Sequence, residues 1–104
     1  MNFNDNLESK ITKENLIVLD FKGCKFLGEI HLVLKEKFGL PEHYGENWDA
    51  LWDCLRYKSL DSFRVEIHGM KTLSKALEEE CKKMLEVFDD VAKQTPTFTY
   101  KIIT

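Results

Sequence analysis

The chain has 104 residues, 43% of them hydrophobic and 32% charged, which is the composition of one globular domain. The net charge of −3 at pH 7 says little by itself, but its concentration in one acidic segment argues against nucleic acid as a direct ligand, because phosphate contacts need a basic surface. No apolar run approaches the length of a membrane span and the polar first residues do not resemble a signal peptide, so we expect a cytoplasmic protein. Three cysteines without a CxxC pair predict neither a disulfide framework nor a zinc site, and we expect small buried residues.

The first predicted element follows a polar beginning. We interpret residues 1–14 as an extension, partly disordered, ahead of a domain that covers residues 15–104. Within Asn15–Phe21, a continuous apolar run from Leu16 to Leu19 predicts a strand that is buried on both faces.

A first helix is predicted after this strand. The side chains that recur there at helical spacing are Leu27, Ile30, Leu34 and Phe38. Gly39 closes the helix, and Pro41 cannot continue it. His31 is predicted to lie on the flank of this helix, without a catalytic role.

A second helix is predicted from Asn47, a good N-cap residue, to about Tyr57. Its apolar stripe consists of Trp48, Leu51 and Leu55. Asp49 and Asp53 fall together on the opposite side. Trp52 lies between the two faces, and we expect it to be partly exposed.

The second half of the chain alternates strand, helix and strand. Phe63–His68 has the period of a strand with one buried face, a long helix runs from about residue 72 to 94, and residues 98–103 form a final strand. The apolar face of the long helix consists of Leu73, Leu77, Cys81, Met84, Phe88 and Val91. Helical connections between strands favour an α/β fold with a parallel sheet and right-handed crossovers.

The segment Pro41–Cys54 (PEHYGENWDALWDC) contains no lysine or arginine. Its four acids are Glu42, Glu46, Asp49 and Asp53. The remaining 14 acids face 15 bases, so the whole negative excess of the chain lies in this segment. On a helix, Asp49 and Asp53 are like charges four residues apart, a spacing that costs a few tenths of a kcal/mol. A focused acidic surface of this kind attracts a basic partner.

Two other interpretations of these residues stay open. The segment could be an ordinary solvated helix face, with Asp49 near the helix N-terminus and Arg56 pairing with Asp53. Alternatively, Asp49, Asp53 and Asp90 could bind a divalent metal, or two carboxylates could act as general acid and base. No catalytic motif accompanies them, so we favour a protein-binding surface without a cofactor, a metal or catalytic residues.

The stretch LPEHYGENWDALWDCL resembles the central motif of the barstar family, intracellular inhibitors of barnase-type ribonucleases. The family pattern is matched by Leu40, Pro41, Tyr44, Gly45, Asn47, Asp49, Ala50, Leu51 and Asp53. The likeness extends from about Ile17 to the C-terminus. It implies a barstar-like three-stranded parallel β-sheet packed against α-helices. It also implies an inhibitor that protects its host from a cytotoxic, guanyl-specific ribonuclease.

The resemblance further implies which residues meet the ribonuclease. Asp53 is the central carboxylate and takes the place of an RNA phosphate, and Asp49 supports it from one turn earlier. Trp52 packs beside them, and Val87 and Asp90 form a second edge on the long helix. The loop residues that meet the enzyme are His43, Tyr44, Gly45 and Asn47.

The chain departs from the barstar pattern at several positions. His43 replaces a tyrosine, Asp90 replaces a glutamate, and Tyr57 and Lys58 replace a glycine and a tryptophan. A histidine that faces a basic enzyme should weaken the complex below roughly pH 6, because the protonated ring is repelled. The alternative partner is another basic protein bound through the same surface. In either case we expect a monomer when free, and neither nucleic acid nor membrane as a partner.

Overall fold

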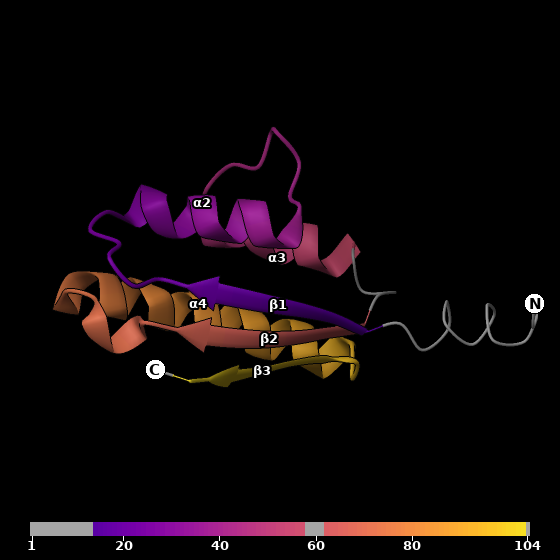
Figure 1. Cartoon of the computed structure of the whole chain (residues 1–104). Coiled ribbons are helices and arrows are strands. Elements are labelled where there is room, and N and C mark those ends of the chain that lie inside the picture. The colour runs from indigo at the N-terminus through magenta and orange to yellow at the C-terminus, as the bar shows by residue number, and fades with distance from the viewer. Residues whose placement is uncertain (1–13, 58–61, 104) are drawn as a thin grey trace, which may run out of the picture.

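The computed structural model of the chain describes residues 14–57 and 62–103. Its elements are β1 Glu14–Asp20, α2 Leu27–Phe38, α3 Trp48–Tyr57, β2 Ser62–His68, a 3₁₀ turn Met70–Thr72, α4 Lys75–Gln94 and β3 Phe98–Ile102. The strands form one parallel sheet in the order β1-β2-β3, which confirms the predicted α/β fold (Figure 1). Most of the predicted polar extension, and Lys58, lie outside the described residues, whereas Glu14 is the first residue of β1.

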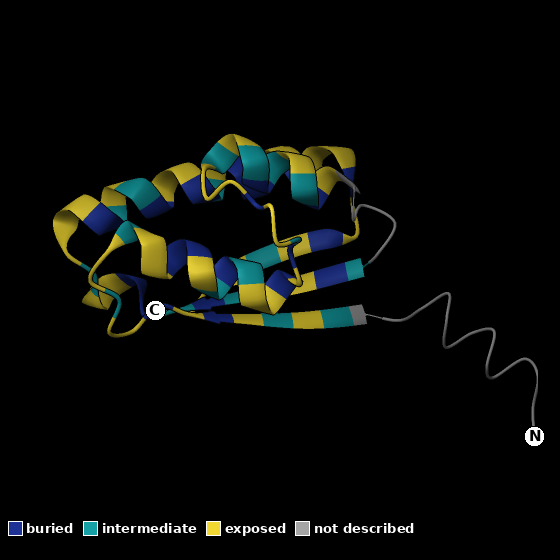
Figure 2. Cartoon of the chain, turned by 90° about the horizontal axis from the view of Figure 1, so that it is seen from above, coloured by how far each residue is buried: buried dark blue, intermediate teal, exposed yellow. Residues whose placement is uncertain are grey.

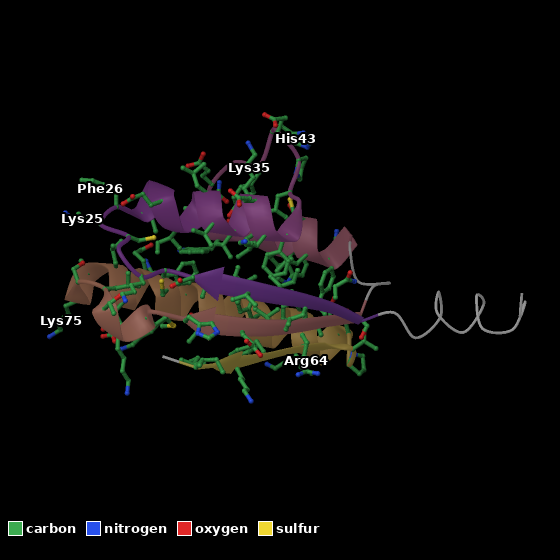
Figure 3. All side chains as sticks on the ribbon, in the orientation of Figure 1. Lys25, Phe26, Lys35, His43, Arg64 and Lys75 are labelled. Atoms are coloured by element: carbon green, nitrogen blue, oxygen red, sulfur yellow. The ribbon has the colours of Figure 1, made fainter. Side chains whose placement is uncertain are left out.

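All three helices cover the same face of the sheet. Each connection advances by one strand in the same direction, and right-handed crossovers therefore place every helix on one side. In Figure 1, α2 and α3 lie above β1, while α4 runs behind the sheet. Within residues 14–57 and 62–103 no helix lies on the opposite face, where Arg64 of β2 points away from the helices (Figure 3).

The strand β1 differs from the prediction. Its side chains alternate, with Leu19 fully buried but Leu16 56% and Val18 38% exposed. The prediction of burial on both faces was wrong, because helices cover only one face and β1 is an edge strand. The apolar run gave no sign of this, since the exposed positions carry leucine and valine.

The core lies between the sheet and the helices. Phe63, Val65 and Ile67 of β2 are buried, as their alternation predicted. Figure 2 shows the same alternation of buried and exposed residues along the strands and the helices. Aromatic rings of all layers meet in the core, with neighbouring centroids 5.5 to 6.2 Å apart, at Phe38, Phe63, Phe88 and Phe98. Edge-on contacts of this kind contribute about 0.5–1.5 kcal/mol per pair beyond the area they bury.

The helix α4 begins later than predicted, at Lys75 instead of residue 72. The Ser74 side chain accepts a hydrogen bond of 3.3 Å from the backbone N–H of Leu77 and so caps the helix. Thr72 belongs to the preceding 3₁₀ turn, where its hydroxyl donates to the carbonyl of Gly69 at 2.6 Å. The cap, rather than the apolar periodicity, therefore determines where the helix starts.

The cysteines are free thiols, as expected, but only Cys81 is fully buried, while Cys24 and Cys54 are half-buried. Across residues 14–57 and 62–103, no helix is long and apolar enough to cross a membrane.

Gly69 follows β2 and Gly23 follows β1. The two glycines form a matched pair for testing how closely the backbone segments after these strands approach each other. Both have a left-handed backbone, with φ of 81° and 88°, so alanine is strained at either position by about 1–3 kcal/mol. At Gly69, a Cβ would also lie 2.5 Å from the backbone nitrogen of Lys22, whereas Gly23 faces open space. We expect Gly69→Ala to lower the free energy of unfolding by at least about 1 kcal/mol more than Gly23→Ala, measured by denaturant titration. Equal losses would contradict this close backbone contact.

Cys81 should react with thiol reagents only after unfolding. Burial raises its pKa to about 12, so almost no thiolate is present at pH 8. We expect an aromatic disulfide reagent to leave Cys81 unmodified in the native protein and to modify it in guanidinium chloride, with the site identified by mass spectrometry. The Cys81→Ala variant serves as the control for assignment. Modification of native Cys81 at the rate of a free thiol would contradict the burial.

Candidate functional site

The predicted acidic segment forms an exposed loop followed by α3. Gly39 ends α2 in a left-handed conformation with φ of 65°, as predicted. A turn follows, in which the N–H of Tyr44 donates to the carbonyl of Pro41 at 2.9 Å. The side chain of Asn47 then accepts a hydrogen bond from the N–H of Ala50 at 2.8 Å, which confirms it as the N-cap of α3. The loop is therefore fixed at both ends by backbone geometry.

The acids of this segment lie on the outside of the molecule. Leu51 and Leu55 of α3 are buried and Trp48 is half-buried, so the predicted apolar stripe faces inward. We use the name acidic surface for the four exposed carboxylates Glu42, Glu46, Asp49 and Asp53. Glu46 has φ of 52°, a strained conformation for a residue with a side chain. Strain of this kind is often found at functional loops.

Two basic groups accompany the acidic surface. Lys35 of α2, which sequence reasoning missed, lies 3.6 Å from the carboxylate of Glu42. Figure 3 shows Lys35 below the loop whose tip carries His43. The guanidinium carbon of Arg56 lies 4.7 Å from the centroid of the Trp52 ring, a cation–π contact. Trp52 is half-buried, as predicted.

A pocket of about 530 Å³ opens between the loop and α3. It is lined by Gly39, Pro41, His43, Tyr44, Gly45, Ala50, Asp53 and Cys54. Apolar groups dominate its wall, and Asp53 contributes the only carboxylate among these residues. Such a pocket can receive a side chain with an apolar stem and a positively charged end.

The structure brings most of the predicted partner-binding residues to one region, although not all are at the surface. The exposed ones are His43, Gly45, Asn47, Asp49, Asp53 and Asp90. Tyr44 is only 6% exposed and Val87 only 9%. In the free chain both side chains belong to the hydrophobic core, and Tyr44 also lines the pocket.

His31 lies in the core, so its predicted place on the flank of α2 was wrong. It is 2% exposed, and its Nδ1 lies 2.7 Å from the hydroxyl of Tyr44. The signal was present in the sequence, because His31 is four residues after Leu27 and three before Leu34, which places it on the apolar side.

Two further residues extend this contact towards α4. The imidazole of His31 packs on the indole of Trp48, with 4.5 Å between ring centroids. The indole N–H of Trp48 donates to a carboxylate oxygen of Glu80 at 3.2 Å. We call His31, Tyr44, Trp48 and Glu80 the support cluster. Nothing in the sequence spacing predicted the link to Glu80, which joins residues 32 positions apart.

The environment determines the charge states of the support cluster. Burial lowers the pKa of His31, an effect that outweighs the opposing carboxylates of Glu46 and Glu80. Burial also raises the pKa of Tyr44. Hydrogen bonds from Lys83 and Trp48 lower the pKa of Glu80. At neutral pH the cluster therefore holds a neutral imidazole, a neutral phenol and an ionised carboxylate.

In the part of the chain that the structure describes, no group of side chains supports the interpretation as a metal site. Within it, no three histidine, cysteine, aspartate or glutamate side chains lie close enough to hold a metal ion.

Comparison with known proteins connects this surface to one family. The family described as Barstar (barnase inhibitor) matches residues 14–102, which is most of the chain. A protein of Bacillus subtilis (strain 168) named "Putative ribonuclease inhibitor YrdF" is 44% identical over 39 residues. That alignment covers 38% of this chain and 43% of the relative, so the chain matches less than half of that protein's length. The family match and the three-stranded parallel sheet with its acidic loop and helix agree, and the chain belongs to the barstar family.

Proposed function

We propose that this protein inhibits a barnase-like, guanyl-specific ribonuclease by covering the enzyme's basic active site with the acidic surface. The observation that carries the proposal is the exposure of four carboxylates on one loop and helix, with Asp53 lining the adjacent pocket. A ribonuclease active site binds RNA phosphates through arginine, lysine and histidine side chains. Carboxylates held at the same spacing can occupy the phosphate positions.

The loop is already in a fixed conformation before the partner arrives. The cap at Asn47, the turn at Tyr44 and the left-handed Glu46 hold its backbone. A preorganised loop loses less conformational entropy on binding, so more of the interaction energy appears as affinity. The repulsion among the clustered acids is relieved at the same time, because each meets a positive charge.

Each predicted residue has a part in this mechanism. Asp53 forms the central contact and Asp49 supports it, while Trp52 packs beside them. Val87 holds up the second edge of the interface from within the core, and Asp90 contacts the partner there. The loop contacts are made by His43, Gly45 and Asn47 directly and by Tyr44 through the pocket wall. No residue of the chain has a catalytic role.

Removal of the central charge should abolish tight inhibition. We expect Asp53→Asn to weaken inhibition of a barnase-type ribonuclease by about 2–5 kcal/mol, at least about 30-fold, because one partner of a buried charge pair is lost; barnase–barstar complexes are themselves a reference for this range. The measurement is RNA hydrolysis titrated with inhibitor.

The matched control for this experiment is Glu36→Gln. It removes the same charge from an exposed residue of α2 outside the acidic surface, and we expect inhibition to stay within about twofold. If both variants inhibit as well as the wild type, the acidic surface does not bind the enzyme. If the wild type itself fails to inhibit, the partner of this surface is another basic protein.

Association should depend strongly on salt. Exposed charges are screened over about 10 Å at 0.1 M ionic strength and over about 3 Å at 1 M. We expect the association rate constant, measured by stopped-flow fluorescence, to fall by at least about tenfold between these two concentrations. The dissociation rate should change less, because the contacts in the formed complex are shielded from solvent. A salt-independent association rate would exclude electrostatic attraction as the driving force.

A further inference from the structure

The support cluster joins four separate segments beneath the acidic surface. His31 belongs to α2, Tyr44 to the loop, Trp48 to the first turn of α3 and Glu80 to α4. Tyr44 and Trp48 stand on either side of Gly45, Glu46 and Asn47, and both are in contact with the imidazole of His31. The conformation of the exposed loop is therefore connected to one buried ring.

We propose that His31 is the positioning residue of the acidic surface, and that protonation of its imidazole releases the loop and with it the bound partner. The release of a partner rests on the proposed function. The positioning of the loop does not, because it concerns the free chain alone.

The direction of the hydrogen bond between His31 and Tyr44 depends on the protonation of the ring. We assign the phenol O–H as the donor and the unprotonated Nδ1 as the acceptor, 2.7 Å apart. A protonated imidazole has no acceptor nitrogen, so the Tyr44 hydroxyl would have to turn and its own proton would lose this acceptor. A buried donor without an acceptor costs about 1–3 kcal/mol. Movement of Tyr44 towards water, and of the loop with it, removes that cost.

The groups around His31 have opposing effects on the protonation of its ring. The carboxylates of Glu46, from the loop, and Glu80, from α4, favour the protonated ring. The face of Trp48 also favours a cation. Glu80 is, however, already paired with Lys83 at 2.9 Å. Burial is the largest effect, so the pKa of His31 lies below its ordinary value and the ring is neutral near pH 7.

The sign of the pH dependence follows from this lowered pKa. In the unfolded chain a histidine binds its proton near pH 6.5, whereas in the folded chain it does so only at lower pH. The contribution of His31 to folding stability is therefore complete above about pH 6.5 and is lost as the pH falls towards the folded pKa. If the partner binds only the neutral arrangement, affinity falls by up to about tenfold per pH unit below that pKa.

The first experiment uses the free protein. NMR follows the protonation of His31 and the hydrogen exchange of the amides from Tyr44 to Asn47, corrected for the intrinsic pH dependence of exchange. In the wild type we expect loop protection to fall as His31 becomes protonated. Tyr44→Phe keeps the ring but lacks the hydroxyl, and it should lower loop protection at all pH values.

His31→Gln and His43→Gln complete the set. Glutamine at position 31 retains an acceptor for the Tyr44 hydroxyl and cannot be protonated, so loop protection should become independent of pH. His43 is exposed at the loop tip, and His43→Gln should behave like the wild type. Loop protection that does not follow the protonation of His31, or that is unaffected in Tyr44→Phe, would overturn the positioning role whether or not the protein inhibits a ribonuclease.

The second experiment measures inhibition of a barnase-type ribonuclease between pH 5 and pH 8. Titrating groups of the enzyme contribute equally to every variant, so the comparison isolates the inhibitor. To remove the repulsion expected of a protonated His43, the comparison is made in the His43→Gln background. We expect the addition of His31→Gln to this background to reduce the acid sensitivity, by up to about tenfold in affinity at the lowest pH. Equal acid sensitivity with and without His31→Gln would overturn release through His31. If no variant inhibits at any pH, both the proposed function and the release of a bound partner are contradicted. The first experiment still decides whether His31 positions the loop.

Discussion

The handedness of the two crossovers is the constraint on which the rest of this structure depends. Because both advance in the same direction along the sheet, every helix lies on one face. That arrangement creates one core, between the sheet and the helices, and leaves the other face without a helix in the part of the chain that the structure describes. The first crossover contains two helices, α2 and α3, and the connection between them, residues 39–47, is mostly exposed. We call this connection the acidic loop. It lies outside the core, so its Glu42 and Glu46 side chains face solvent.

The acidic surface combines a local cost in folding with the proposed use in binding. Like charges on α3 and a left-handed Glu46 both destabilise the free chain, by about 1–3 kcal/mol in the case of the backbone. The cap at Asn47, the buried Leu51 and Leu55 and the support cluster offset these costs. The exposed charges are therefore carried on a backbone that these contacts support.

The sequence predicted those features that depend on neighbouring residues. The period of β2, the closure of α2 at Gly39, the cap at Asn47 and the two faces of α3 follow from local spacing, and all are confirmed. The order of strands and helices predicted a parallel sheet, and the resemblance to barstar predicted that it has three strands. Features that depend on distant segments were missed.

Three particular residues show why. Leu16 looks like a core residue, and only the one-sided layering of helices exposes it. His31 has a position on the apolar side of α2, but its polar ring suggested the flank; the hydroxyl of Tyr44 is what allows it to be buried. Glu80 is one of several charged residues on α4, and nothing local distinguishes the one that meets Trp48. The sequence thus predicted which acidic side chains are exposed, but not the buried contacts beneath them.

The pairing of β1 with β2 brings together residues separated by nearly half of the chain, from Glu14 beside Ser62 to Asp20 beside His68. Closing so long a segment has an entropic cost that must be met before the ladder forms, and parallel sheets of this kind fold slowly for that reason. The acidic loop lies near the middle of this segment and outside the layers that must come together. Its charges take little part in the search for the native topology. If the acidic surface binds a ribonuclease as proposed, its exposed charges can therefore be exchanged to suit a different enzyme with little effect on folding.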